Sequence, residues 1–275
     1  EHKSLLRENQ TQRRRERAQE LRTIKREGVL AKRRKASDDG SEGQPWSNEE
    51  LQAAVNGVKQ SPPTTVLPYL VSLRKLLSLD DPPLQDVVEA GVGNKLISLL
   101  SVPNDELQIE ATWCLTNIAS GHTRFTESIL GAAPQLINFL SAPNPELQEH
   151  ALWTLGNIAG DGASFREILH ANGALLPMAR LLQDPPTPVV ARTAAWALSN
   201  LARGRQTPAQ PFLEVGLAIP LAAAMAGEGK DRALAVEAAW VLAFLTAKGD
   251  ESGAVLLEAG VVPSLVQALV DSQGE

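Results

Sequence analysis

The sequence predicts an all-α fold built from repeats of about 42 residues, and two sets of evenly spaced residues support this prediction. The tryptophans of the first set lie 40, 43 and 44 residues apart: Trp113, Trp153, Trp196 and Trp240. The glycines of the second set lie 40, 42, 43 and 44 residues apart: Gly91, Gly131, Gly173, Gly216 and Gly260. Leu and Ala dominate the apolar residues and favour packed helices. Two independent patterns with one shared period indicate stacked units rather than a single enlarged core.

Each unit is predicted to contain three helices. A short helix ends at the glycine, a second carries an apolar pattern such as AAPQLINFL, and a longer third helix carries the tryptophan. Loops rich in turn-forming residues, such as SVPND and QDPPTP, separate the second helix from the third. Because this period and helix number are typical of armadillo repeats, we expect a right-handed superhelical armadillo solenoid over residues 49–275.

The first 48 residues have a different composition. Residues 1–35 contain 13 Lys and Arg against 5 Asp and Glu, whereas the remainder contains 13 and 27. The basic stretch has too few apolar residues to fold alone, so we expect a flexible arm that becomes helical on a partner. Residues 36–48 have a linker composition, and Ser47 with Glu50 matches a capping box that predicts a helix start. The acidic body should attract cationic partners and repel nucleic acid.

Several functional classes are not supported by the sequence. The single cysteine, Cys114, lies in an apolar helical pattern and is predicted to be a core thiol in a reducing compartment. There is no apolar run long enough for a membrane span. The four histidines show no metal-ligand spacing, and no catalytic motif or phosphate-binding loop occurs. We therefore expect no enzymatic activity, no metal and no cofactor.

Three of the tryptophans have an asparagine four residues later, on the same helix face: Asn117, Asn157 and Asn200. A carboxamide can accept one N–H and donate to one C=O of an extended peptide. Successive indoles would form slots for Lys and Arg side chains through apolar and cation–π contacts. Buried asparagines would need a partner in every repeat, which favours asparagines that face a bound peptide. The alternative is that the indoles fill the core and the asparagines cap helices.

Asp161 follows the second of these asparagines by four residues, where the third helix is predicted to end. A carboxylate at this position would bind the ammonium group of one peptide lysine. The alternative interpretation is an ordinary turn residue.

These segments resemble the importin-α (karyopherin-α) family, the adaptors of nuclear import. ATWCLTNIASG, HALWTLGNIAGDG and RTAAWALSNLARG resemble the second, third and fourth armadillo repeats of the family in order. VEAAWVLAFLT resembles the fifth repeat, with Phe244 in place of the asparagine. PWSNEEL and RKLLSLDDPPLQDVVEAG resemble the entry to the first repeat, and the stretch from RRRER to KRRK resembles the importin-β-binding segment. The resemblance therefore implies this segment and about the first five repeats.

The resemblance also implies a groove that binds the Lys/Arg-rich nuclear localisation signals of cargo proteins. Asp161 would receive the key lysine, Thr126 would help to hold it, and Ser120 and Gly121 would shape the adjoining pocket. Arg203 stands where the family has a groove cation. The implied peptide-binding residues are Trp113, Asn117, Ser120, Gly121, Thr126, Trp153, Asn157, Asp161, Trp196, Asn200, Arg203, Glu237 and Trp240. His150 and Ala233 depart from the residues usual in the family.

The resemblance assigns two roles to the basic arm. It would bind importin-β through basic residues and two leucines: Arg13, Arg14, Arg15, Arg17, Leu21, Arg22, Lys25, Arg26, Leu30, Lys32, Arg33 and Arg34. Lys32, Arg33 and Arg34 would also occupy the groove and inhibit it when importin-β is absent, favoured by a high effective concentration. The chain would then shuttle between cytoplasm and nucleus. The alternatives for the arm are a solvated charge run, a simple targeting signal or a nucleic-acid-binding segment. The alternative for the whole chain is an armadillo scaffold for other extended peptide partners.

Overall fold

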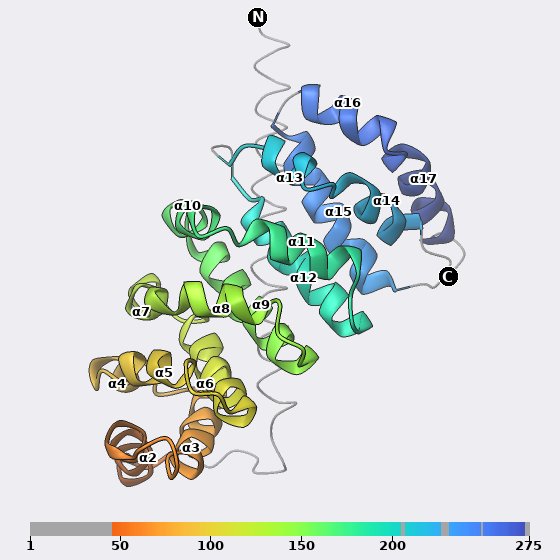
Figure 1. Cartoon of the computed structure of the whole chain (residues 1–275). Coiled ribbons are helices and arrows are strands. Elements are labelled where there is room, and N and C mark those ends of the chain that lie inside the picture. Colours follow the sequence, from red (N-terminus) through yellow and green to blue (C-terminus); the bar gives the residue numbers. More distant parts are fainter. Residues whose placement is uncertain (1–45, 205–206, 227–230, 249, 273–275) are drawn as a thin grey trace, which may run out of the picture.

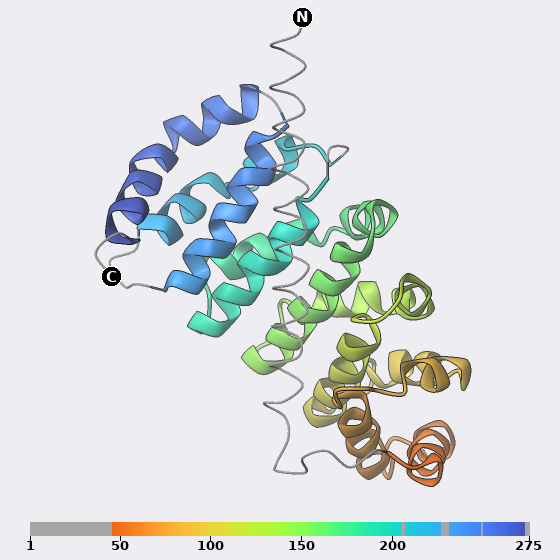
Figure 2. The same cartoon turned by 180° about the vertical axis from the view of Figure 1, so that it is seen from behind.

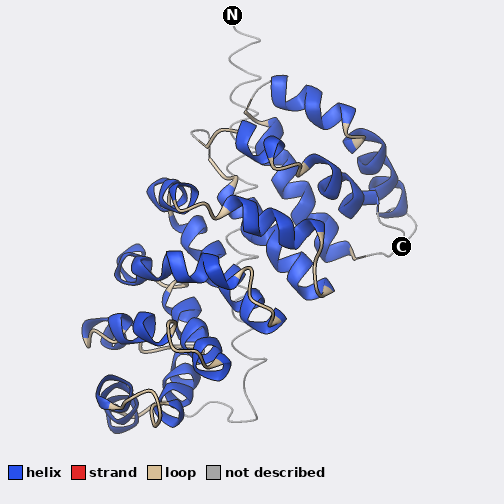
Figure 3. Cartoon of the chain, viewed as in Figure 1, coloured by secondary structure: helices blue, strands red, loops and turns tan. Residues whose placement is uncertain are grey.

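The computed structural model describes residues 46–204, 207–226, 231–248 and 250–272, which form helices and loops without a β-strand (Figure 3). The predictions for residues 1–35 and for most of the linker lie outside these residues. The described part of the chain is an all-α armadillo solenoid, which confirms the predicted fold class.

The helices occur in successive units of two or three. The first unit has two helices, α2 (Asn48–Gln60) and α3 (Leu67–Leu77). The second has α4 (Leu84–Glu89), α5 (Gly93–Leu99) and α6 (Asp105–Ile118). The third has α7 (Thr123–Ile129), η1 (Leu130–Ala132), α8 (Ala133–Phe139) and α9 (Pro145–Asp161).

Two further units follow, and then the start of another. The fourth unit has α10 (Ala163–Ala171), α11 (Leu175–Gln183) and α12 (Pro188–Leu201). The fifth has α13 (Gln210–Glu214), α14 (Ala218–Ala226) and α15 (Arg232–Thr246). A further unit is represented by α16 (Asp250–Glu258) and α17 (Val261–Ser272), so the described array extends beyond five repeats.

The third helices form a continuous stack through the array (Figures 1 and 2). Each contacts its counterpart in the next unit, in the order α3, α6, α9, α12 and α15. Each also packs against the second helix of its own unit. This arrangement repeats the side chains of the third helices along one continuous surface, as expected for a solenoid.

Local chemistry explains where many helices begin and end. The predicted capping box is present: the Ser47 hydroxyl accepts from the Glu50 N–H, and the Glu50 carboxylate accepts from the Ser47 N–H. Four of the periodic glycines have φ between 72° and 79°, a conformation that favours glycine: Gly91, Gly173, Gly216 and Gly260. Gly131 is the exception, because it lies inside the 3₁₀ turn η1. The prediction that the first helix of the unit ends at the glycine is therefore wrong at Gly131, because α7 ends at Ile129 and the chain continues through η1.

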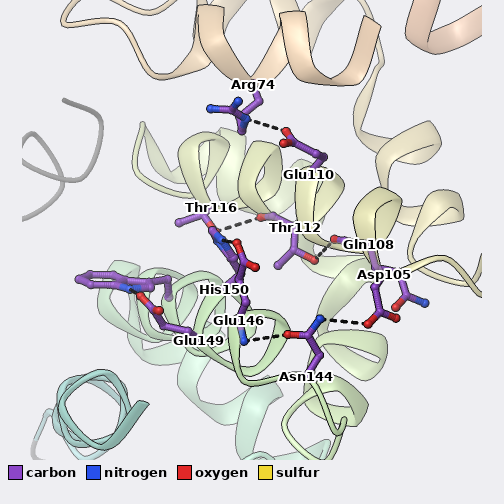
Figure 4. Close-up of polar contacts among 11 residues, drawn as sticks. Arg74, Asp105, Gln108, Glu110, Thr112, Thr116, Asn144, Glu146, Glu149 and His150 are labelled. Atoms are coloured by element: carbon purple, nitrogen blue, oxygen red, sulfur yellow. Dashed lines mark hydrogen bonds and ion pairs between the residues drawn. The ribbon is translucent and has the colours of Figure 1, made fainter. Parts of the chain in front are cut away.

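The core is made mainly of leucine, alanine, valine and isoleucine from all three helices of each unit. Cys114 is fully buried, which confirms the predicted core thiol, and burial raises the pKa of this thiol. Polar contacts also connect the units. Arg74 of α3 forms an ion pair with Glu110 of α6, with 2.6 Å between Nε and Oε2, as Figure 4 shows.

Candidate peptide-binding site

The four periodic tryptophans lie on the third helices α6, α9, α12 and α15. We call the face of these helices that carries Trp113, Trp153, Trp196 and Trp240 the tryptophan face. Trp196 is 8 % exposed, and the other three are partly buried. The indoles therefore combine packing with partial exposure, and this exposure does not by itself decide between the two interpretations weighed from the sequence.

The spacing between neighbouring rings differs along the tryptophan face. The ring centroids of Trp153 and Trp196 lie 4.5 Å apart with an interplanar angle of 42°. These two indoles are in contact, which leaves no room for a side chain between them. The expectation of a slot between these two rings is wrong. Farther along, Trp240 stacks with Phe244, with centroids 5.9 Å apart and an angle of 27°.

Trp113 already makes a cation–π contact within the chain. The guanidinium carbon of Arg74 lies 4.6 Å from the centroid of the indole. His150 of α9 packs against the same indole, with ring centroids 4.7 Å apart. The Arg74 guanidinium is held in place by its ion pair with Glu110 (Figure 4). Sequence reasoning did not identify Arg74, because its partners lie more than 35 residues away along the chain.

The periodic asparagines are buried, with exposures of 5 %, 0 % and 2 % for Asn117, Asn157 and Asn200. Each side-chain NH₂ donates to the preceding third helix or its cap. Asn117 donates to the Ser78 hydroxyl at 3.2 Å. Asn157 donates to the Thr116 carbonyl at 3.1 Å, and Asn200 donates to the Gly156 carbonyl at 3.0 Å.

The asparagines therefore connect neighbouring units. The expectation that all three carboxamides point outward is wrong, because one partner in each repeat is supplied by the chain itself. A carboxamide has a second N–H and a carbonyl oxygen that remain for other partners. At Asn157 the Oδ1 atom is buried and has no hydrogen-bond partner.

Three buried oxygens without partners occur on the neighbouring helices α7 and α9: Thr126 Oγ1, Asn157 Oδ1 and Asp161 Oδ2. Asp161 is the last residue of α9, one turn after Asn157, as the sequence predicts. Thr123, one turn before Thr126 on α7, donates to Asp161 Oδ1 at 3.3 Å. Because an unsatisfied buried polar atom costs about 1–3 kcal/mol, these oxygens favour a ligand that donates hydrogen bonds. A lysine ammonium has three donors and a positive charge.

Ser120 and Gly121 shape the segment between α6 and α7. The Ser120 hydroxyl donates to the Asn117 carbonyl at 2.7 Å. A Cβ atom on Gly121 would lie 2.6 Å from Phe125 Cδ2 and 3.0 Å from Leu84 Cδ1. Glycine is thus required for close packing of Phe125, which precedes Thr126 on α7.

The remaining sequence-predicted residues lie farther along the array. Glu237 is 9 % exposed and precedes Trp240 by three residues on α15. Arg203 follows α12 and is partly buried, and burial lowers the pKa of its guanidinium. Arg203 follows the third helix of the unit after the one that ends with Asp161.

Two classes of site are not found among the residues that the structure describes. No group of three or more His, Cys, Asp or Glu side chains there is arranged to hold a metal ion. None of the described helices is both long and apolar enough to cross a membrane.

Comparison with known proteins supports the repeat assignment. A family model for the Armadillo/beta-catenin-like repeat matches residues 80–120 and 129–160, and one for the HEAT-like repeat matches residues 145–201. Importin subunit alpha-1a of Oryza sativa subsp. japonica is 33 % identical over 263 residues, which is 91 % of this chain and 49 % of the relative. Importin subunit alpha-2 of the same plant is 43 % identical over 82 % of this chain and 43 % of the relative.

Solved structures give the same result for the fold. A designed armadillo repeat protein in complex with the peptide (KR)4 superimposes with a TM-score of 0.72 at 28 % identity, covering 80 % of this chain and 91 % of the designed chain. A second designed armadillo repeat protein superimposes with a TM-score of 0.73 at 26 % identity, covering 79 % of this chain and 91 % of its own. The chain spans about half the length of the curated relatives that it matches. By fold the described part of the chain is an armadillo-repeat solenoid, and by sequence the chain is similar to importin subunit alpha proteins.

Proposed function

We propose that the chain is a non-enzymatic nuclear import adaptor that binds Lys/Arg-rich nuclear localisation signals along the tryptophan face. The observation that carries the proposal is the set of three unpartnered oxygens on Thr126, Asn157 and Asp161. They would receive the ammonium group of one peptide lysine. The names of the relatives and the basic peptide bound to the designed armadillo protein support the same chemistry.

Cationic side chains on either side of this lysine would lie over the indoles. Arg74 over Trp113 is an example of this contact within the chain. Each cation–π contact contributes about 0.5–2 kcal/mol. The remaining carboxamide donors would bind the peptide backbone without reading its sequence. Affinity would therefore come from many weak contacts, and specificity would come mainly from Asp161.

The basic arm would connect cargo to importin-β. Residues 13–34 would bind importin-β, and Lys32, Arg33 and Arg34 would occupy the tryptophan face when importin-β is absent. Replacement of these three residues by alanine is then expected to raise the affinity of the isolated chain for a basic peptide. Equal affinity with and without the replacement would contradict autoinhibition. With importin-β bound, the adaptor would carry its cargo between cytoplasm and nucleus.

The decisive variant is Asp161→Asn, which removes the charge and keeps the shape of the side chain. Its affinity for a fluorescent Lys-rich peptide is expected to fall about tenfold or more, since a hydrogen bond to a charged group contributes about 1.5–3 kcal/mol. Asp86→Asn, at an exposed position of α4, is the matched control and should change affinity less than twofold. If both variants bind as the wild type does, Asp161 is not the lysine site.

A second candidate is an armadillo scaffold for extended partners without basic clusters. The net charge of −6 disfavours acidic partners and leaves neutral ones open. A neutral peptide of equal length, measured beside the Lys-rich peptide, distinguishes the two. Equal affinity for both peptides would favour the scaffold.

A further inference from the structure

Three cationic side chains gather where the third, fourth and fifth units meet. They are Arg166 of α10, Arg203 after α12, and Lys248 after α15. Arg166 Nη2 lies 3.1 Å from the position that a Cβ atom on Gly204 would occupy, next to Arg203. The Lys248 ammonium donates to the carbonyl of Ala202, the residue before Arg203 in the sequence, at 2.7 Å.

The charges in this cluster are not balanced by acids. No carboxylate among the described residues forms an ion pair with Arg166, Arg203 or Lys248. The carboxylate of Glu167 acts on Arg166 only through its electrostatic field, and this side chain is exposed. Burial, and then the proximity of Arg203, lower the pKa of Arg166. Burial, and then Arg166, lower the pKa of Lys248 to about 8. Because like charges repel in a partly buried site, the cluster favours an added anion.

The buried guanidinium has free binding capacity. Arg166 is 8 % exposed, and its Nη1 atom donates to the Ala159 carbonyl at 2.9 Å. Its Nε atom is buried and has no partner. Nε and Nη2 form one edge of the guanidinium, the edge that can bind two oxygens of a phosphate or carboxylate at once. Gly204 has no side chain that would press against Nη2.

Two members of the cluster, Arg203 and Lys248, lie close to the C-terminal end of a third helix, as Asp161 does in its own unit. Asp161 is the last residue of α9, Arg203 lies two residues after the end of α12, and Lys248 lies two residues after the end of α15. One edge of the array thus has an acid at the end of the third unit and cations at the ends of the fourth and fifth. A peptide that lies along this edge would meet first one sign of charge and then the other.

We propose that Arg166, Arg203 and Lys248 form an anion site that binds a phosphorylated residue of the peptide whose lysine is held at Asp161. This inference rests on the proposed function. Stacked helices lie about 8–10 Å apart and an extended peptide rises about 3.3 Å per residue, so each unit corresponds to about three residues. The phosphorylated residue is therefore expected roughly three to six residues from the lysine.

The test compares peptides that carry one lysine cluster and either serine or phosphoserine, placed four residues to its N-terminal or its C-terminal side. One of the two phosphopeptides is expected to bind the full chain about five- to twenty-fold more tightly than its serine counterpart. The body has 13 Lys and Arg against 27 Asp and Glu outside residues 1–35, so a phosphate elsewhere should weaken binding. A gain in affinity is therefore specific evidence for a local cationic site.

The variants Arg203→Gln and Lys248→Gln should each reduce the ratio of the two dissociation constants towards one. Arg180→Gln, at an exposed position of α11, is the matched control and should leave the ratio unchanged. If the serine peptides bind but neither phosphoserine improves affinity, or if Arg180→Gln removes the gain equally, the anion site is wrong and the adaptor function stands. If neither form binds, both proposals fail.

Discussion

Trp196 packs directly against the backbone of Gly156 in the preceding third helix. A Cβ atom on Gly156 would lie 2.1 Å from Cζ3 of this indole, far inside van der Waals contact. The same glycine accepts a hydrogen bond from Asn200 through its carbonyl oxygen. One residue of α9 thus positions both members of the next Trp–Asn pair on α12.

The variant Gly156→Ala is expected to destabilise the array by about 1–3 kcal/mol, because the indole must move away from a tightly packed helix. Alanine is a better helix former than glycine by about 1 kcal/mol, which offsets part of this cost. Chemical denaturation measures the net effect. Gly253→Ala on α16, where a Cβ atom meets nothing within 4 Å, is the control and should be neutral or stabilising. A Gly156→Ala variant as stable as this control would contradict the packing account.

The double variant Trp113→Ala with Trp153→Ala is expected to bind a basic peptide at least tenfold more weakly while remaining helical. Both indoles are partly buried, so some loss of stability should accompany the loss of affinity. Two cation–π contacts of about 0.5–2 kcal/mol each account for the change in binding. Fluorescence anisotropy measures affinity, and circular dichroism verifies the fold. Unchanged affinity in a folded variant would rule out the tryptophan face as the binding surface.

The variant Thr126→Val separates binding from folding. The Thr126 hydroxyl is fully buried and has no partner, so an isosteric methyl group should leave stability unchanged or raise it by up to about 1 kcal/mol. Affinity for the Lys-rich peptide should fall several-fold, because the hydroxyl would bind the lysine ammonium. Thermal melting and peptide titration on the same sample measure both effects. A marked loss of stability would show that the hydroxyl serves the fold.

Lys248 predicts a specific dependence of stability on pH. Its pKa of about 8 in the folded chain lies below the ordinary lysine value of 10.5, chiefly because of burial and then because of Arg166. Between these two values the unfolded chain binds more protons, so the free energy of unfolding should rise as the pH increases from about 8 to 10.5. The neighbouring His170 has a pKa lowered by burial and has lost its proton before this range.

The comparison with Lys248→Met isolates this effect. The difference in unfolding free energy between wild type and variant should grow by about 1 kcal/mol in favour of the wild type across this range, a value reduced because the ammonium is partly exposed. Urea denaturation at pH 7 and pH 10 provides the measurement. Parallel curves for the two proteins would contradict the lowered pKa.

The repeat architecture was predictable from the sequence because periodic spacing determines which helix face a residue occupies. The helix that starts after Ser47, the buried Cys114 and the end of α9 at Asp161 follow from local patterns and are confirmed. Spacing along one helix does not give the tilt between helices. The sequence analysis therefore did not predict the contact between Trp153 and Trp196.

Contacts between distant parts of the chain were also beyond local reasoning. The three asparagines bond to residues 39–44 positions earlier, which no pattern within a single repeat reveals. The cluster of Arg166, Arg203 and Lys248 joins segments from three units. Only Arg203 of this cluster was singled out, through the family resemblance.

The central claim is that a lysine of a bound peptide lies between α7 and the end of α9. A crystal structure of the chain with a Lys-rich peptide tests this claim most directly. The account predicts a lysine Nζ within about 3.2 Å of Asp161 Oδ2, with Thr126 Oγ1 as a second partner. A peptide bound elsewhere, with these two oxygens still unpartnered, would contradict it.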